Sequence, residues 1–368
     1  MTKIVRPERN DDAPYDLVVF CHLRWGFVYQ RPQHIISRLS RTRKTLLIEE
    51  PWHRPESKEH KLIRVSGNLD VLQPNVHRIE DILDLLPTYF PNRQVAVGWM
   101  YSPSFLPLLD YFDFGTLVYD CMDELSLFKG APEAIIAQET ALLAAADVIY
   151  TGGKSLYEAK RDRHQNVHCF PSSVDERHFA RALEPLDTPA DMEQISAPVV
   201  GYFGVIDERI DYGLLDETAR LLPGVNFAMV GPLAKVGEED LPRRENIHYL
   251  GMKAYEELPA YLRCFDIAMM PFALNDSTKF ISPTKTLEYM AAGRPIISTP
   301  IRDVVRDYDE VVSIVSDAPR FAAAVERMLV KGEIAQQILG RYRPILERTS
   351  WDNTVTRMDT LLTPTTVQ

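Results

Sequence analysis

Short apolar runs alternate with amphipathic stretches along nearly the whole chain. The runs are rich in Val, Ile and aromatic residues, which is typical of buried strands. Strands are predicted at 16–22, 45–49, 76–80, 94–101, 116–120, 147–151, 166–170, 198–204, 226–232, 246–251, 265–271, 295–299 and 311–315. Apolar residues at helical spacing follow many of these runs, for example over 30–40 and 133–146. The alternation predicts an α/β protein with doubly wound, parallel sheets.

The alternation of predicted strands and helices is interrupted once, near the middle of the chain. Residues 181–198 contain three prolines and several acids and show little apolar pattern, so we interpret them as an interdomain linker. The length of 368 residues suits two domains. We therefore expect an N-terminal domain over 1–180, the linker over 181–198, a C-terminal domain over 199–345, and a helix and tail over 346–368 that pack back on the N-terminal domain.

One stretch, Ser282 to Thr299, combines a sharply bounded helix with a following strand. Ser282 is a suitable N-cap, and Pro283 suits the first helical position because its missing N–H costs nothing there. Gly293 suits the residue after the helix, and Pro295 prevents the helix from resuming.

The start of this helix predicts an anion site, because free N–H groups and the positive end of the helix dipole meet there. Lys285 adds a full charge, and Glu288 lies one turn after Thr284 on the same face. A carboxylate in that place suits a diol such as ribose, so the helix is typical of a nucleoside diphosphate site. The alternative is an ordinary surface helix.

Composition limits the binding partners and the cellular location that we expect for this protein. The net charge of −11 argues against a nucleic-acid partner. No apolar stretch is long enough to span a membrane, the first ten residues do not form a signal peptide, and the four cysteines lack metal or disulfide spacing. We expect a cytoplasmic protein, with peripheral association at the inner face of the membrane left open. Arg38, Arg41, Arg43 and Lys44 form a basic patch or a solvated helix end.

Ligands of parallel sheets gather beyond the carboxyl ends of strands. The loop after the first strand places Trp25, Gly26, Arg31 and Gln33 near a possible cleft. Another strand ends in acids that include Asp120 and Asp123, which suggests a base, a sugar-hydroxyl acceptor or a helix-capping cluster.

The sequence Gly152-Gly-Lys-Ser155 is similar to the end of a P-loop. That motif needs a glycine where this chain has Val148, so we reject a P-loop.

These segments resemble the GT-B glycosyltransferases, and more narrowly the GT4-like "glycosyl transferases group 1". The resemblance runs from about Asp16 to about Met358 and is strongest over 283–299, over 201–209, and at Trp25 with 30–34. The last of these is typical of bacterial cell-surface polysaccharide transferases of the teichuronic-acid type. The resemblance implies two Rossmann-like domains facing across a cleft and a retaining, metal-independent transfer from a UDP- or GDP-sugar to a saccharide or lipid-linked acceptor, without a cofactor.

The resemblance also implies roles for individual residues. Glu288 would bind the donor ribose, and the amides around Ser282, Pro283, Thr284 and Lys285 would cradle the diphosphate. The remaining donor residues would be Gly26, Gly204, Val205, Arg209, Gly231, Met252 and Lys253. The catalytic candidates are Asp120, Asp123, Arg209 and Lys285, and the acceptor or sugar candidates are Trp25, Arg31, Gln33, Asn275 and Asp276.

One position departs from the family pattern. Phe280 stands where the family has an acid that contacts the transferred sugar, and Asn275 or Asp276 would have to replace it. Two alternatives stay open: a non-catalytic sugar-nucleotide-binding subunit, which Phe280 suggests, and a nucleotide-sugar 2-epimerase, which the missing acid argues against without excluding it.

Overall fold

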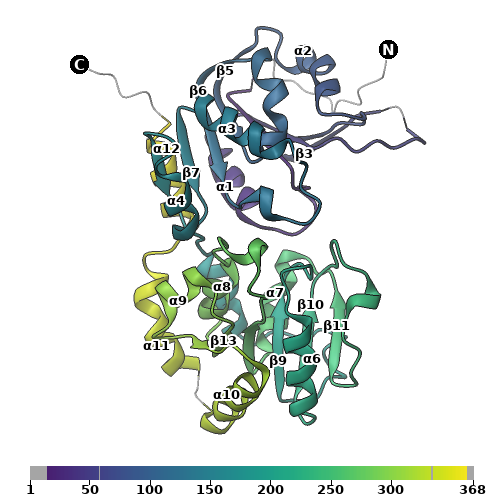
Figure 1. Ribbon diagram of the computed structural model, residues 1–368, viewed down its shortest axis with the longest axis vertical. Coiled ribbons are helices and arrows are strands. Elements are labelled where there is room, and N and C mark those ends of the chain that lie inside the picture. Colours follow the sequence, from purple (N-terminus) through teal and green to yellow (C-terminus); the bar gives the residue numbers. More distant parts are fainter. Residues whose placement is uncertain (1–14, 58, 333–334, 363–368) are drawn as a thin grey trace.

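The computed structural model describes residues 15–57, 59–332 and 335–362. They form two lobes stacked along the long axis of the molecule (Figure 1). No helix in these ranges combines the length and the apolar character needed to cross a membrane.

The N-terminal lobe is built on an eight-stranded sheet with the order β3-β4-β2-β1-β5-β6-β7-β8. Its pairings are parallel except for the antiparallel β3–β4 hairpin. Apolar clusters cover both faces of the sheet. The strands are β1 (Leu17–Cys21), β2 (Thr45–Glu49), β3 (Lys61–Ser66), β4 (Leu69–Gln73), β5 (Gln94–Met100), β6 (Asp113–Cys121), β7 (Val148–Thr151) and β8 (Val167–Cys169).

The strand predicted at 76–80 is wrong, and the hairpin of β3 and β4 was missed. Residues 76–79 form bends before a short 3-10 helix over Glu80–Asp84. Strand β3 lies at the edge of the sheet and is largely exposed, so its side chains lack the apolar run of a buried strand.

The C-terminal lobe has a six-stranded, fully parallel sheet with the order β11-β10-β9-β12-β13-β14. One large apolar cluster packs around it and includes Ala182 and Met192 from the predicted linker. The linker segment is therefore packed on this lobe. The strands are β9 (Val199–Phe203), β10 (Asn226–Val230), β11 (Ile247–Gly251), β12 (Ile267–Met270), β13 (Ile296–Ser298) and β14 (Ser313–Ile314).

Helices surround both sheets (Figure 1). The N-terminal lobe carries α1 (Arg31–Leu39), α2 (Leu86–Tyr89), α3 (Ile135–Ala145) and α4 (Lys154–Lys160). The rest of the chain contributes α5 (Glu176–Ala180), α6 (Tyr212–Leu221), α7 (Leu258–Arg263), α8 (Thr284–Ala291), α9 (Arg302–Tyr308), α10 (Ala318–Lys331), α11 (Ala335–Leu346) and α12 (Trp351–Thr360).

Helix α12 returns to the N-terminal lobe, as Figure 1 shows in yellow. Trp351 at its start stacks on His34 of α1, with ring centroids 4.9 Å apart. Arg38 and Arg41 pair with Asp352 at 3.2 and 2.8 Å. The basic patch predicted from the sequence is thus partly neutralised by this helix, and Arg43 adds an ion pair to Asp359.

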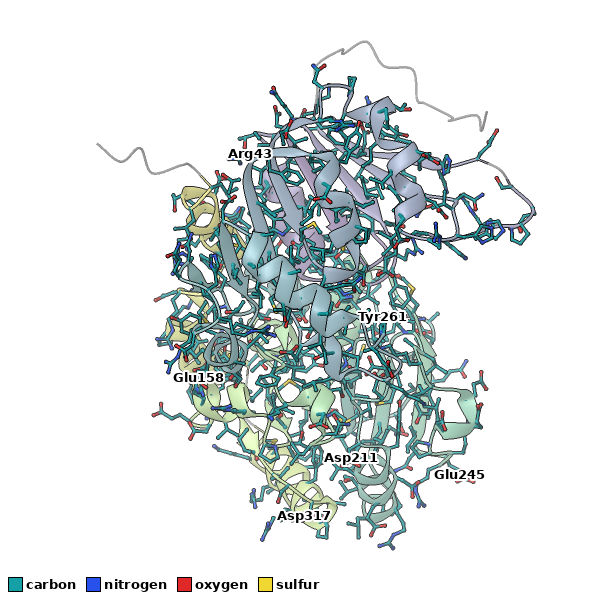
Figure 2. All side chains as sticks on the ribbon, turned by 45° about the horizontal axis from the view of Figure 1, so that its top comes forward. Arg43, Glu158, Asp211, Glu245, Tyr261 and Asp317 are labelled. Carbon is teal, nitrogen blue, oxygen red and sulfur yellow. The ribbon has the colours of Figure 1, made fainter. Side chains whose placement is uncertain are left out.

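Helices α4 and α9 connect the lobes on one side of the cleft. Glu158 of α4, labelled in Figure 2, pairs with Arg302 and Arg306 of α9. The carboxylate of Asp303 accepts a hydrogen bond from the Ser155 amide at 3.1 Å. A side chain at Gly153 would clash with Asp303 and Ser282, so this glycine serves the contact between lobes and no P-loop forms.

We expect Trp351→Ala to lower the free energy of unfolding by about 3–5 kcal/mol, because a large, fully buried ring is lost. Trp351 is 1% exposed, whereas Trp52 is 58% exposed and provides a matched control. Trp52→Ala should change stability by less than about 0.5 kcal/mol. Urea denaturation checks both values, and equal effects of the two substitutions would contradict the packing role of α12.

Candidate functional site

Three cavities follow one another between the lobes. They are lined by residues just beyond the strands of both sheets, including His22 after β1, Met122 after β6, Gly231 after β10 and Met252 after β11. The carboxyl ends of both sheets therefore face one cleft, as expected for parallel sheets that bind ligands. We name the cavities the glycine-lined cavity (about 260 Å³), the helix-end cavity (about 90 Å³) and the large cavity (about 400 Å³).

The glycine-lined cavity brings together five residues that the sequence predicted for the donor: Gly26, Gly204, Gly231, Met252 and Lys253. Gly204 and Gly231 have φ of +135° and +150°, a region that side chains rarely adopt. A Cβ at Gly231 would lie 1.8 Å from the Gly204 carbonyl oxygen. The two strand ends can approach this closely only as glycines.

The helix-end cavity lies at the start of α8. The predicted N-cap Ser282 is wrong, because Pro283 is the capping residue and its extended backbone (ψ 119°) delays the helix to Thr284. The Ser282 carbonyl instead accepts a hydrogen bond from Ser172 of the N-terminal lobe at 2.5 Å. No side chain caps α8, so its first amides remain available to a ligand. The predicted end is confirmed, since Gly293 is left-handed with φ +64°.

Lys285 reaches from α8 across the backbone of β9. A Cβ at Gly204 would lie 2.1 Å from the Lys285 Cε atom, and the Nζ atom lies 5.6 Å from the Tyr202 ring centroid. Burial lowers the pKa of Lys285, although Glu288 opposes this effect. Among the described residues, Lys285 has no ion-pair partner within 4.0 Å, so its charge is available to a ligand.

Glu288 lies on the same face of α8 and is 6% exposed. Burial raises its pKa to about 7, against the effects of Lys285 and a hydrogen bond from Thr284. A buried carboxylate with so few partners that stabilise its charge is unusual in a purely structural helix and common at functional sites.

Arg209 stands where the helix-end cavity meets the large cavity and lines both. Its Nε and Nη2 atoms donate to the carboxylate of Asp207, with the shortest contact at 2.6 Å. Burial lowers the pKa of Arg209 and Asp207 raises it, with a net rise. The fork to Asp207 fixes the guanidinium in the cleft, next to Val205, which lines the large cavity.

The two predicted acids have different environments. Asp120 is fully buried at the end of β6 and accepts hydrogen bonds from Arg31 Nε and Nη2 at 3.1 and 2.8 Å. It cannot contact an acceptor directly, so the direct catalytic role predicted for it is corrected to holding Arg31. Asp123 lines both the helix-end and the large cavity, and burial raises its pKa to about 6 despite Arg209.

Arg31 lines the helix-end cavity, but its three polar atoms are used within the lobe, because Nη1 donates to the Phe170 carbonyl at 2.8 Å. Trp25 and Gln33 line none of the three cavities. Gln33 is buried, and its Nε2 atom donates to the carbonyls of Trp25 and Val28. Gln33 thus shapes the first loop, and the contact of Trp25 and Gln33 with an acceptor stays a prediction.

Asn275 and Asp276 are exposed and also line none of these cavities. The Asn275 side chain caps the short 3-10 helix over Asp276–Thr278, and the role of either residue in place of the family acid stays a prediction. Phe280, which stands in the place of that acid, packs against the apolar cluster of the N-terminal lobe.

Sequence reasoning missed four residues of the cleft: His22, Phe128, Lys235 and Tyr255. His22 lines the large cavity, and burial together with Lys235 lowers its pKa to about 4. The Phe128 ring lies within 5.8 Å of Arg209 and 4.6 Å of Lys235 from the opposite lobe. Of these four residues, only His22 could have been proposed from the sequence, because it stands at the end of a predicted strand.

The described part of the chain contains no cluster of three His, Cys, Asp or Glu side chains that could hold a metal ion. The side chains of Lys285, Arg209 and Asp123 line the helix-end cavity, where the first amides of α8 have no side-chain cap.

Comparison with known proteins agrees with this geometry. Residues 197–331 match the family described as "Glycosyl transferases group 1". The "Putative teichuronic acid biosynthesis glycosyltransferase TuaH" of Bacillus subtilis (strain 168) is 24% identical over 293 residues, which cover 74% of this chain and 72% of that protein.

Solved structures share the whole architecture at low identity. The sucrose-phosphate synthase of Thermosynechococcus elongatus superposes with a TM-score of 0.72 at 14% identity, covering 94% of this chain and 97% of that one. Anabaena Alr3699/HepE, in complex with UDP and glucose, gives a TM-score of 0.65 at 12% identity, covering 95% and 99%. Residues 197–331 therefore form a glycosyl transferases group 1 domain, and the chain is a glycosyltransferase with the GT-B fold.

Proposed function

We propose that this glycosyltransferase moves a sugar from a UDP- or GDP-sugar to a saccharide or lipid-linked acceptor in cell-surface polysaccharide synthesis, with retention of configuration and without a metal. The observation that carries the proposal is the uncapped start of α8, where the partly exposed Lys285 precedes the buried Glu288 by one turn. A cation for phosphate and a carboxylate for a diol, one turn apart, match a nucleoside diphosphate.

The residues that line the cavities support a specific placement of the donor. The nucleoside occupies the glycine-lined cavity, where the backbone of Gly204 and Gly231 permits close approach. The diphosphate lies at the helix end, facing the first amides of α8, Lys285 and Arg209. The structure of the Anabaena protein with UDP and glucose supports a nucleotide sugar as the donor class.

The chemical step follows from this placement. The bond between the anomeric carbon and the diphosphate oxygen breaks while the acceptor oxygen bonds to the same face of the sugar. The acceptor proton passes to the departing phosphate. Lys285, Arg209 and the helix dipole stabilise the charge that develops on the diphosphate, which is the kind of term that usually contributes most to catalysis.

Asp123 is placed to orient the acceptor, because it lines both the helix-end and the large cavity. The large cavity has room for a saccharide and offers His22 and Glu50 as further polar groups. The name of the Bacillus relative supports a role in cell-surface polysaccharide synthesis.

We expect Lys285→Ala and Glu288→Ala to weaken binding of UDP or GDP at least about tenfold, because each removes a charged partner of the ligand. Isothermal titration calorimetry with both nucleotides measures the effect. Lys61→Ala and Glu326→Ala, at exposed positions on β3 and α10, serve as matched controls. Unchanged affinity in the α8 variants would show that the nucleotide binds elsewhere.

Metal independence has a separate test. Protein treated with EDTA should bind UDP or GDP within about twofold of its affinity in millimolar Mg²⁺, since cationic side chains and helix amides supply the charge. Titration in the two buffers checks this. Binding that appears only with Mg²⁺ would contradict the proposal.

The buried ionisation of Glu288 predicts a pH-dependent stability. Its pKa rises from 4.5 in the unfolded chain to about 7 in the folded protein, so the folded state binds more protons between these values and becomes less stable as pH rises. Glu288→Gln removes this penalty. Relative to the wild type, the variant should gain about 2–3 kcal/mol between pH 5 and pH 8.

Urea denaturation at the two pH values checks this gain. Glu326→Gln on the exposed face of α10 is the control and should show no gain. A pH-independent difference between Glu288→Gln and the wild type would mean that Glu288 ionises normally.

A further inference from the structure

Tyr255 begins the short 3-10 helix over Tyr255–Glu257 that follows β11, and the residue lines the glycine-lined cavity. Its hydroxyl oxygen is buried and has no hydrogen-bond partner among the described residues. Buried hydroxyls normally find a partner, because losing water without a replacement costs free energy. The hydroxyl of Tyr255 therefore needs an explanation.

A charged neighbour gives one part of that explanation. Burial raises the pKa of Tyr255, and the charge of Glu288 raises it further. Tyr255 and Glu288 belong to separate elements, the short 3-10 helix after β11 and the helix α8. Yet the structure contains no hydrogen bond between them, so both groups can serve the same ligand.

The Tyr255 ring is fixed on both sides. It stacks on Tyr29 of the N-terminal lobe with centroids 4.4 Å apart, and on His178 of α5 with centroids 4.0 Å apart at 9°. His178 Nε2 also lies 2.9 Å from the Tyr255 carbonyl oxygen and donates to it, because a carbonyl can only accept. A ring held in this way cannot turn its hydroxyl toward solvent.

We propose that Tyr255 is a donor-binding residue whose hydroxyl, together with Glu288, hydrogen-bonds the ribose diol of the donor nucleotide. The inference rests on the proposed function, since it assigns a further contact in the same donor site. Because Tyr29 and Tyr255 belong to different lobes, their stack exists only when the lobes are closed. Donor binding at Tyr255 is thereby linked to lobe closure.

Tyr255→Phe tests the hydroxyl and leaves the ring stack in place. With UDP or GDP, whichever the wild type binds more tightly, the variant should bind about five- to tenfold more weakly. Its thermal midpoint without ligand should be unchanged or higher, because an unpartnered buried hydroxyl is removed. A purely structural role for the hydroxyl would give the opposite pair of results.

Tyr249→Phe is the matched control. Its hydroxyl donates to the Pro242 carbonyl at 3.3 Å, and the residue lines none of the three cavities. It should leave nucleotide affinity unchanged. The 2′-deoxy and 3′-deoxy forms of the same nucleotide then locate the contact, because the loss caused by Tyr255→Phe should shrink with at least one of them.

The outcomes separate this inference from the function on which it rests. If the wild type binds neither nucleotide, the proposed function fails. If the wild type binds and Tyr255→Phe binds equally well, only the role of Tyr255 fails. A loss in Tyr255→Phe that stays complete with both deoxy nucleotides would overturn the ribose contact.

Discussion

The proposed donor site depends on a close approach between two strand ends. Gly204 after β9 and Gly231 after β10 adopt positive φ, and a Cβ at Gly231 would lie 1.8 Å from the Gly204 carbonyl oxygen. The same absence of a side chain at Gly204 lets Lys285 pass directly over the backbone, since a Cβ there would lie 2.1 Å from its Cε atom. A side chain at either glycine would separate the strand ends or push the ammonium group out of the cleft. Backbone geometry, more than any single contact, thus decides where the charge of α8 is presented.

Charged groups inside the molecule are of two kinds. Some pair with each other and support the fold, whereas others lack such partners and belong to the proposed site. Asp120 and Arg31 use their polar atoms on each other and on the Phe170 carbonyl, so they form a closed unit that fixes α1 against β6. Lys285, which is partly exposed, and the buried Glu288 lack such partners. The pKa of Lys285 is lowered and that of Glu288 is raised, so both shifts favour the uncharged form. Leaving charges in this state costs stability, which proteins accept mainly at functional sites.

Much of the fold could be predicted from the sequence because buried parallel strands carry apolar runs and end in loops that face one cleft. That rule placed Gly26 near the cleft, where it lines one cavity with Gly204, Gly231 and Met252, which the resemblance to the family had indicated. It could not separate Asp120 from Asp123, because the chain leaves strand β6 at Cys121 and only the structure shows which acid points inward. Nor could it find Tyr255 or Lys235, whose surroundings are created by the opposite lobe. The edge strand β3 was missed for a related reason, since exposure removes the apolar signal.

Phe280 shows how a departure from the family pattern can be accommodated. Its ring packs against the apolar cluster of the N-terminal lobe, so the position that usually presents an acid to the sugar contributes here to the contact between lobes. Other contacts act in the same direction. Phe128 reaches from the N-terminal lobe to Arg209 and Lys235, and Tyr29 stacks on Tyr255. Apolar and aromatic contacts across the cleft favour the closed arrangement in which Asp123 and Arg209 line the same cavities. Closure of this kind excludes water from the cleft, and a closed cleft also positions a bound substrate by its shape.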